Sequence, residues 1–229
     1  MLNRILEPEV MDTVAEAIDY DQMDHSAVNR LFVDDLLSAL GPTPPATMLQ
    51  VFDAGTGTAQ IPLELIRRGI AAIVTATDLA EQMLIVAQRN VNVAGFATSI
   101  RLELADCKQL TTVNDTFDVV MSNSIVHHIP EPLRVLAELW RILKPGGLLF
   151  VRDLMRPCDQ VTLDHLVQTY AGTSNHHQQQ MFRESLHAAL TVDEVRDLLA
   201  QVGIPSSSVQ ATSDRHWTIA AKKPDSKRL

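Results

Sequence analysis

The sequence predicts an α/β fold of three layers, in which a mostly parallel β-sheet is covered by helices on both faces. After residue 48, short apolar segments rich in β-branched residues alternate with helical segments. Such alternation is typical of parallel strands joined by crossover helices, and strands buried on both faces read as continuous apolar runs. The expected strands lie at 48–54, 72–78, 99–106, 117–124 and 147–154.

The helix before the fifth strand has the clearest periodicity. Its apolar positions recur at helical spacing and stop at Pro145-Gly146-Gly147; they are Leu133, Leu136, Leu139, Trp140 and Leu143. Near the C-terminus, a helical segment, TVDEVRDLLAQVG, precedes two strand-like segments, SVQATSD and HWTIAAKK. A tight turn between these two predicts an antiparallel hairpin that completes the sheet.

The whole chain, residues 1–229, is expected to form one domain. Residues 1–47 are predicted to form a helical cap, which the breaker GPTPPAT ends because proline interrupts a helix. The core is expected to span 48–223, followed by a tail at 224–229. Residues 155–187 are polar and contain the run TSNHHQQQ, so we expect them to form a helical, lid-like insertion after the fifth strand.

Composition and charge limit the classes of partner. The formal net charge of −9 argues against a nucleic-acid surface, because binding to phosphates requires clustered Lys and Arg. A small-molecule substrate is therefore expected. No apolar run is long enough to cross a bilayer, and MLNRILEPEVMD lacks the apolar stretch of a signal peptide. Two cysteines, Cys107 and Cys158, are typical of a protein in the reducing cytoplasm. The oligomeric state is not predicted.

The stretch VFDAGTGTAQ, residues 51–60, predicts a ligand site at the end of the first strand. The turn Gly55-Thr56-Gly57 lets a ligand approach the backbone closely, because glycine has no Cβ. Asp78 ends the second strand about twenty residues further on, where an acid would bind the hydroxyls of a ribose. Enzymes that bind a dinucleotide share these features with enzymes that bind an adenosine.

Three features favour the adenosine. Asp53 would repel a pyrophosphate but would attract the ammonium group of an amino acid. The third glycine of the dinucleotide pattern is replaced by Gln60. Asp106 ends the third strand, where it could accept a hydrogen bond from an adenine amino group. A ligand with an ammonium, a ribose and an adenine but no phosphate fits all three features, and S-adenosylmethionine is such a ligand.

Five motifs resemble those of the class I, S-adenosylmethionine-dependent methyltransferases over roughly residues 48–223. They are VFDAGTGTA, TATDLAEQM, LELADCKQL, FDVVMSNSIVHHIPEP and RILKPGGLLFVRD. The resemblance implies a Rossmann-like sheet of seven strands, the last antiparallel, with S-adenosylhomocysteine as a product. Residues 17–33 also resemble the N-terminal cap of quinone-biosynthesis C-methyltransferases and similar small-molecule enzymes.

By motif position, the resemblance also implies which residues bind the cofactor. Asp53, Gly55 and Gly57 would line its methionine end, Asp78 its ribose, Leu79 and Met83 the side of its adenine, Asp106 and Cys107 the adenine edge, and Asn123 the sulfonium. Ala59 stands where the family often has a third glycine. Alanine is the smallest alternative and suits the start of a helix, so cofactor binding is expected to persist.

Two histidine pairs are candidates for other roles. His127 and His128 follow the fourth strand, where a neutral imidazole could remove a proton from a methyl acceptor; alternatively, one ring orients the loop. His176 and His177 form the second pair. Neither pair has helical i, i+4 spacing or an accompanying set of Cys or Glu, so no metal is expected.

Candidate substrate residues come from several parts of the chain: Tyr20, His25, Asn29, Arg152 and Tyr170. Arg152 could hold an anionic substrate group, or it could pair with Asp153 or another acid. Most of the other four could equally be packing or surface residues.

Methyl transfer is an in-line displacement in which the leaving thioether needs no proton, so alignment and exclusion of water are the main requirements. The sequence does not identify the acceptor, and O, N, S and C all remain open. The alternatives are methylation of a protein or another macromolecule, a nicotinamide-dependent oxidoreductase, and a non-catalytic module that binds the cofactor.

Overall fold

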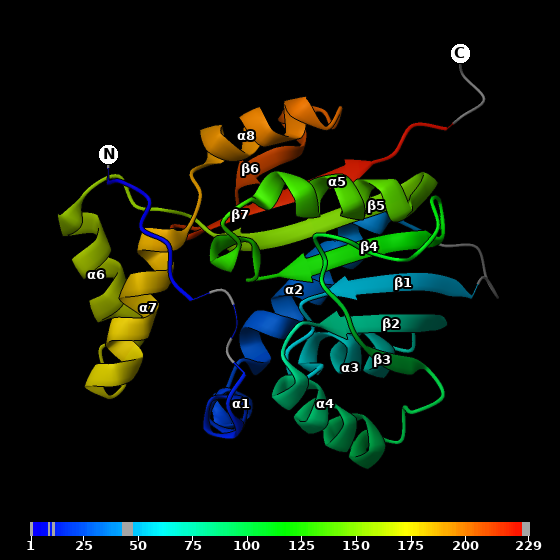
Figure 1. The fold of residues 1–229 in the computed structure, drawn as a ribbon, viewed down its shortest axis with the longest axis horizontal. Coiled ribbons are helices and arrows are strands. Elements are labelled where there is room, and N and C mark those ends of the chain that lie inside the picture. Colours follow the sequence, from blue (N-terminus) through cyan, green and yellow to red (C-terminus); the bar gives the residue numbers. More distant parts are fainter. Residues whose placement is uncertain (1, 9, 11, 43–47, 226–229) are drawn as a thin grey trace.

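The computed structural model describes residues 2–8, 10, 12–42 and 48–225 (Figure 1). Within these residues, one sheet contains the strands β1 (Leu49–Ala54), β2 (Ala72–Asp78), β3 (Ile100–Leu104), β4 (Phe117–Asn123), β5 (Leu143–Leu154), β6 (Val209–Ala211) and β7 (His216–Lys222). The α-helices are α1 (Val14–Gln22), α2 (Ser26–Leu40), α3 (Gln60–Arg67), α4 (Glu81–Ala94), α5 (Pro132–Ile142), α6 (Gln160–Ala171), α7 (His176–Ala188) and α8 (Val192–Gln201). Two short 3₁₀ turns are η1 (Val126–His128) and η2 (Ser206–Ser208).

The order of the strands confirms the predicted topology. Across the described sheet it is β3-β2-β1-β4-β5-β7-β6, and β7 runs antiparallel to both of its neighbours while β1 to β5 are parallel. The direction in which successive strands are added reverses between β1 and β4. In open α/β sheets, the crevice at such a reversal is where ligands bind, outside the carboxyl ends of the strands.

Helices cover both faces of the sheet (Figure 1). Successive residues of β1 point to opposite faces: Val51 packs under α2, α3 and α4, whereas Phe52 and Ala54 pack under α5 and α8. On α5, the periodic apolar residues Leu136 and Leu139 are fully buried in the second of these cores. The apolar face of α5 therefore packs against the sheet, as its sequence periodicity predicts.

Two element boundaries differ from the expectation. α5 ends at Ile142, and Leu143 is the first residue of β5 instead of the last apolar residue of the helix. Leu143 pairs with Phe117 of β4, and the register then shifts so that Leu148 pairs with Val119. The extra residues of this bulge include Gly146, whose positive φ of 77° suits glycine. β3 is also shorter than expected, which leaves Asp106 in the following loop.

The N-terminal part is only partly helical. Residues 2–8, called the N-terminal segment below, form no regular element, and helix begins only at Val14. Arg4 and Ile5 bond instead to the carbonyls of Ala188 and His187, so the segment runs along the end of α7. Residues 43–47 of the predicted breaker lie outside the described residues.

The insertion after β5 is helical, as predicted. Helices α6 and α7 pack against each other through an apolar core of their own and stand beyond the carboxyl ends of the parallel strands (Figure 1). Helices α1 and α2 approach the same end of the sheet, where α1 contacts α4 and α2 contacts α3 and β5. Whether the insertion acts as a lid stays a prediction. No helix among the described residues is long and apolar enough to cross a bilayer.

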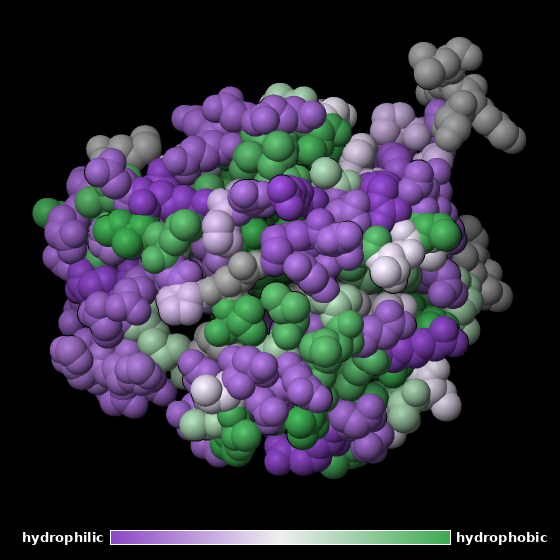
Figure 2. Space-filling model, viewed as in Figure 1, coloured by the Kyte–Doolittle hydropathy of each residue, from purple (hydrophilic) through white to green (hydrophobic). Residues whose placement is uncertain are grey.

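The face of the molecule that Figure 2 shows is mostly polar. Polar residues cover most of the face that the figure shows, and apolar residues are concentrated around its middle. This distribution agrees with the acidic composition of the chain, which has 28 Asp and Glu against 19 Lys and Arg.

We expect the substitution Leu139→Ala to lower the free energy of unfolding by about 2–5 kcal/mol, because it leaves a cavity in the core between α5 and the sheet. The control Leu104→Ala removes the same atoms from a side chain on β3 that is 61% exposed, and should cost less than about 1 kcal/mol. Urea denaturation of both variants measures the difference, and equal losses would contradict the described core.

Candidate active site

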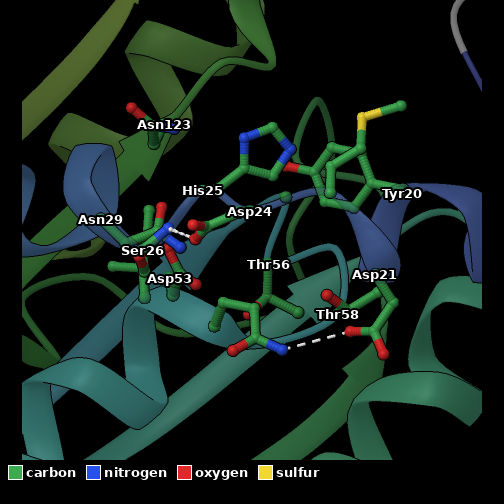
Figure 3. A pocket seen from close by; sticks show the side chains of 14 residues that line it. Tyr20, Asp21, Asp24, His25, Ser26, Asn29, Asp53, Thr56, Thr58 and Asn123 are labelled. Atoms are coloured by element: carbon green, nitrogen blue, oxygen red, sulfur yellow. Dashed lines mark hydrogen bonds between the residues drawn. The ribbon is translucent and has the colours of Figure 1, made fainter.

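Two adjoining cavities lie at the carboxyl ends of β1, β2 and β4. The first cavity lies between the α1–α2 junction and the loop after β1 (Figure 3). The second cavity lies between the loops that follow β2, β3 and β4. Tyr20, Gly55 and Asn123 line both cavities. One extended ligand could therefore occupy both.

All nine residues expected at the cofactor line these cavities. Asp53 lines the first, Gly55 and Asn123 line both, and Gly57, Asp78, Leu79, Met83, Asp106 and Cys107 line the second. They come from four different strand ends. The structure brings them together because the carboxyl ends of parallel strands meet at one edge of the sheet.

The loop after β1 adopts a conformation that depends on glycine. Gly55 has φ +69° and Gly57 has φ +54°. A Cβ on Gly55 would lie 2.1 Å from Cγ2 of Ile125, which rules out any side chain without movement of the neighbouring loop. Ala59, the N-cap of α3, also has a positive φ of 63°. Alanine thus adopts there the left-handed conformation that glycine adopts at lower cost.

Asp78 holds this loop from the next strand. Its Oδ2 accepts a hydrogen bond of 2.8 Å from the Gly57 amide, and its Oδ1 accepts one of 2.9 Å from the Ala80 amide. Burial raises the pKa of the Asp78 carboxyl, although these amides oppose the shift. A carboxylate has about four acceptor sites, so Asp78 can still accept from a ligand hydroxyl in the second cavity.

Asp53 is a buried acid at the floor of the first cavity. Only 2% of the residue is exposed. Burial raises the pKa of its carboxyl to about 7; the Thr56 hydroxyl lowers the pKa and the charge of Asp78 raises it further. Near neutral pH this carboxyl is therefore poised between its two protonation states, and a cation in the cavity would favour the ionised form.

Polar atoms without partners also face the first cavity. Among the described residues, the hydroxyl of Thr58 and Nε2 of His25 are buried and form no hydrogen bond, and both residues line this cavity. Buried polar atoms are normally paired, so they indicate a site for ligand or water. The ring of His25 lies 5.2 Å from that of Tyr20, and Figure 3 shows the two rings side by side.

Asp21 anchors α1 to this site, although the sequence analysis did not select it. Its carboxylate accepts a hydrogen bond from the side chain of Gln60 (Figure 3). It also accepts one from the side chain of Asn90 and pairs with Arg89. An acid within the run AIDYDQMDH gives no distinctive signal, because its partners lie on α3 and α4.

The adenine-edge candidates have different environments. Asp106 accepts a hydrogen bond from the Lys108 amide and pairs with its ammonium at 2.9 Å. Burial raises the pKa of this carboxyl, but the hydrogen bonds and the charge of Lys108 together lower it overall. Cys107 is buried beside Thr77, and burial raises the pKa of its thiol to about 11. The thiol therefore stays protonated, as expected for a packing residue.

The histidines after β4 occupy two distinct positions. His127 is buried and lines neither cavity; its Nδ1 lies 2.5 Å from Oδ1 of Asp153, and its Nε2 lies 3.5 Å from Glu7. Burial disfavours the imidazolium, but Asp153 and Glu7 raise the pKa of His127 overall. His128 lines the second cavity, and burial together with the charge of His127 lowers its pKa to about 4. The assignment of either ring as a general base stays a prediction.

Three of the substrate candidates line the first cavity, and two lie elsewhere. Tyr20, His25 and Asn29 are in its wall. Arg152 is buried within the fold, where it pairs with Asp35 at 2.6 Å and donates to Thr218 instead of pairing with Asp153. Tyr170 is 44% exposed and donates a hydrogen bond to Asp214. Both side chains are held by local partners outside the cavities.

Comparisons with known proteins show which sequences and structures this chain is similar to. Residues 52–151 match a family described as methyltransferase domain. The ubiquinone/menaquinone biosynthesis C-methyltransferase of Cereibacter sphaeroides is 30% identical over 140 residues, which are 60% of this chain and 55% of that protein. The chain thus spans about half the length of this curated relative.

Solved structures share the fold. An S-adenosylmethionine-dependent methyltransferase of Aquifex aeolicus superposes with a TM-score of 0.66 at 20% identity, covering 92% of this chain and 98% of the other. A phosphoethanolamine N-methyltransferase of Haemonchus contortus, in complex with S-adenosylhomocysteine, gives a TM-score of 0.69 at 14% identity. The superposition covers 93% of this chain and 58% of the other.

Residues 52–151 thus resemble a methyltransferase domain, and the chain shares the fold of solved S-adenosylmethionine-dependent methyltransferases. In sequence, the chain is similar to C-methyltransferases of ubiquinone and menaquinone biosynthesis.

We expect affinity for S-adenosylhomocysteine to rise with pH between pH 6 and pH 8. Because the pKa of Asp53 is about 7, its carboxyl is mostly protonated at pH 6 and mostly ionised at pH 8. If only the ionised form pairs with the ligand ammonium, the affinity increases up to about tenfold over this interval. Calorimetry at several pH values measures this increase. In Asp53→Asn, the remaining dependence should be smaller; an unchanged profile would exclude Asp53 as its source.

Proposed function

We propose that this protein transfers a methyl group from S-adenosylmethionine to a small-molecule acceptor bound in the first cavity. One observation carries the proposal: nine residues expected at the cofactor from four separate motifs line two adjoining cavities at the switch point of the sheet. If these motifs served folding alone, their residues would not be expected to line the same two adjoining cavities.

The charges that line the first cavity suit a cation better than a phosphate. Its described lining contains Asp21, Asp24 and Asp53 but no Lys or Arg. A pyrophosphate would be repelled there, whereas an ammonium or a sulfonium would be attracted. This favours S-adenosylmethionine over a nicotinamide dinucleotide as the ligand.

The second cavity suits an adenosine. Leu79, Met83 and Ile125 offer apolar contacts to a flat base, and Asp78 offers acceptors to ribose hydroxyls. Gly55 lines both cavities and Gly57 lines the second, so a ligand can pass close to the backbone between them.

The residues of this chain would act mainly by positioning. S-adenosylmethionine, when bound, supplies a methyl group on a positively charged sulfur. Tyr20, His25 and Asn29 would hold the acceptor against the loop after β1, and the α1–α2 junction would limit the access of water. Asn123, which lines both cavities, stands where the two ligands would meet.

The acceptor is proposed to be small because α1 and α2 form one wall of the first cavity. A folded macromolecule could present only a narrow group there. The names of the curated relatives make a reduced quinone ring, methylated on carbon, the first acceptor to test.

The class of ligand is tested by calorimetric titration with S-adenosylhomocysteine and, separately, with NADH. We expect saturable binding of S-adenosylhomocysteine and none of NADH, because the first cavity repels phosphate. Binding of NADH alone would refute the proposal. Labelled donor offered with a quinol, a small amine or bulk protein then reports which class of acceptor takes up the label.

Asp78→Ala should weaken affinity for S-adenosylhomocysteine by roughly ten- to a hundredfold, because it removes charge-assisted hydrogen bonds both to the ribose and to the Gly57 amide. Asp197→Ala, at an exposed position on α8, is the matched control and should bind like the unmodified protein. Calorimetry measures both. Full affinity in Asp78→Ala would contradict the assignment to the ribose.

A further inference from the structure

One carboxylate and two imidazoles converge beside the second cavity. Glu7 belongs to the N-terminal segment, and His127 and His128 belong to η1. Oε1 of Glu7, Nε2 of His127 and Nδ1 of His128 lie within 4.8 Å of one another. The Glu7 oxygen is 3.5 Å from the His127 nitrogen and 3.1 Å from the His128 nitrogen.

The remaining polar atoms of Glu7 and His127 are held by other partners. Oδ1 of Asp153 lies 2.5 Å from Nδ1 of His127, so this ring nitrogen carries the proton. A ring that binds a metal is neutral, and the lone pair of His127 would then be on Nε2, which faces Glu7. Oε2 of Glu7 accepts a hydrogen bond of 3.2 Å from the Ser185 hydroxyl of α7. The other oxygen, Oε1, lies near the two histidines. Metal-binding histidines are typically oriented by a carboxylate in this way.

Two of the converging atoms have no hydrogen-bond partner among the described residues. In the described part of the chain, Glu7 Oε1 and His128 Nδ1 are both buried and neither has a hydrogen-bond partner, although they lie 3.1 Å apart. Lone pairs that face one another in a buried site repel unless a proton or a cation lies among them. The cluster therefore requires a positive centre.

We propose that Glu7, His127 and His128 bind a divalent transition-metal ion, for which Zn²⁺ is the best match. Two imidazoles and one carboxylate suit Zn²⁺, whereas Mg²⁺ and Ca²⁺ prefer sites made of oxygen. At bond lengths of about 2.1 Å, ligand atoms in a tetrahedral site lie about 3.4 Å apart, close to the separations observed here.

Charges around the cluster both oppose and favour a cation. The guanidinium of Arg4 donates to the carbonyls of His127 and Ile129, and its charge opposes a metal. The carboxylates of Glu7 and Asp153 offset it with two negative charges. Three protein ligands leave a fourth position for water, and His128 also lines the second cavity.

Such an ion would fasten the N-terminal segment to the wall of the cofactor site. Glu7 reaches the cluster from one end of the chain, and Ser185 connects it to α7. From the sequence alone no metal is expected, because neither histidine pair has helical i, i+4 spacing or an accompanying set of Cys or Glu. The fold brings that glutamate from 120 residues away. With the metal bound, His127 Nε2 and His128 Nδ1 would be ligands and not proton acceptors.

The test uses full-length protein treated with a chelator, then titrated with ZnCl₂ by calorimetry and with CoCl₂ by absorption spectroscopy. We expect one equivalent of Zn²⁺ per chain and the visible bands of tetrahedral Co²⁺. Glu7→Gln, which can still accept from Ser185, and His128→Ala should each weaken Zn²⁺ affinity at least about tenfold and abolish the Co²⁺ bands.

The matched control is the double variant His176→Ala/His177→Ala, which removes two exposed histidines from the start of α7. It should keep both the Zn²⁺ affinity and the Co²⁺ spectrum. The absence of saturable binding in the unmodified protein would overturn the proposal and leave a shared proton as the positive centre. Equal loss in the control would overturn it too. Because the first measurement needs no variant, misfolding of a variant cannot produce that result.

Discussion

The buried carboxylate of Asp153 is the constraint on which the geometry of the site depends. It accepts hydrogen bonds of 2.6 Å from the amides of Val126 and Leu154 and lies 2.5 Å from the His127 ring. Burial disfavours its charge, but His127 and these amides lower the pKa of Asp153, so it stays ionised. An ionised carboxylate inside a protein is tolerated only while its donors stay in place. Asp153 therefore fixes η1 against the end of β5.

The position of the loop after β1 depends on the same constraint. Ile125, just before η1, fills the space where Gly55 would carry a Cβ. From the opposite side, Asp78 holds the Gly57 amide. The left-handed backbone at Gly55 and Gly57 costs little because both are glycines, whereas at Ala59 it costs about 1–2 kcal/mol. The surroundings of Ala59, which is fully buried against the sheet, compensate for this strain.

Two buried charged residues near the site, Asp53 and Arg152, have different surroundings. Asp53 has few partners and a raised pKa, a combination that is common at ligand-binding sites. Arg152 is also buried, but Asp35, Thr218 and the ring of Phe32 surround its guanidinium. Its charge is satisfied within the fold and stabilises the contact between α2 and the sheet. Burial alone thus does not show whether a charged residue binds a ligand.

The sequence by itself determined the order of strands and helices and the common location of the residues proposed to bind the cofactor. Local apolar periodicity encodes the elements, and each motif directly follows a strand whose carboxyl end reaches a common edge. Asp53, Asp78 and Asn123 could be selected for this reason. Only the tertiary structure decided the roles of Glu7, Arg152 and His127, because their partners lie far away along the chain. Such contacts leave no periodic trace in a single sequence, since they arise only when separate elements pack together.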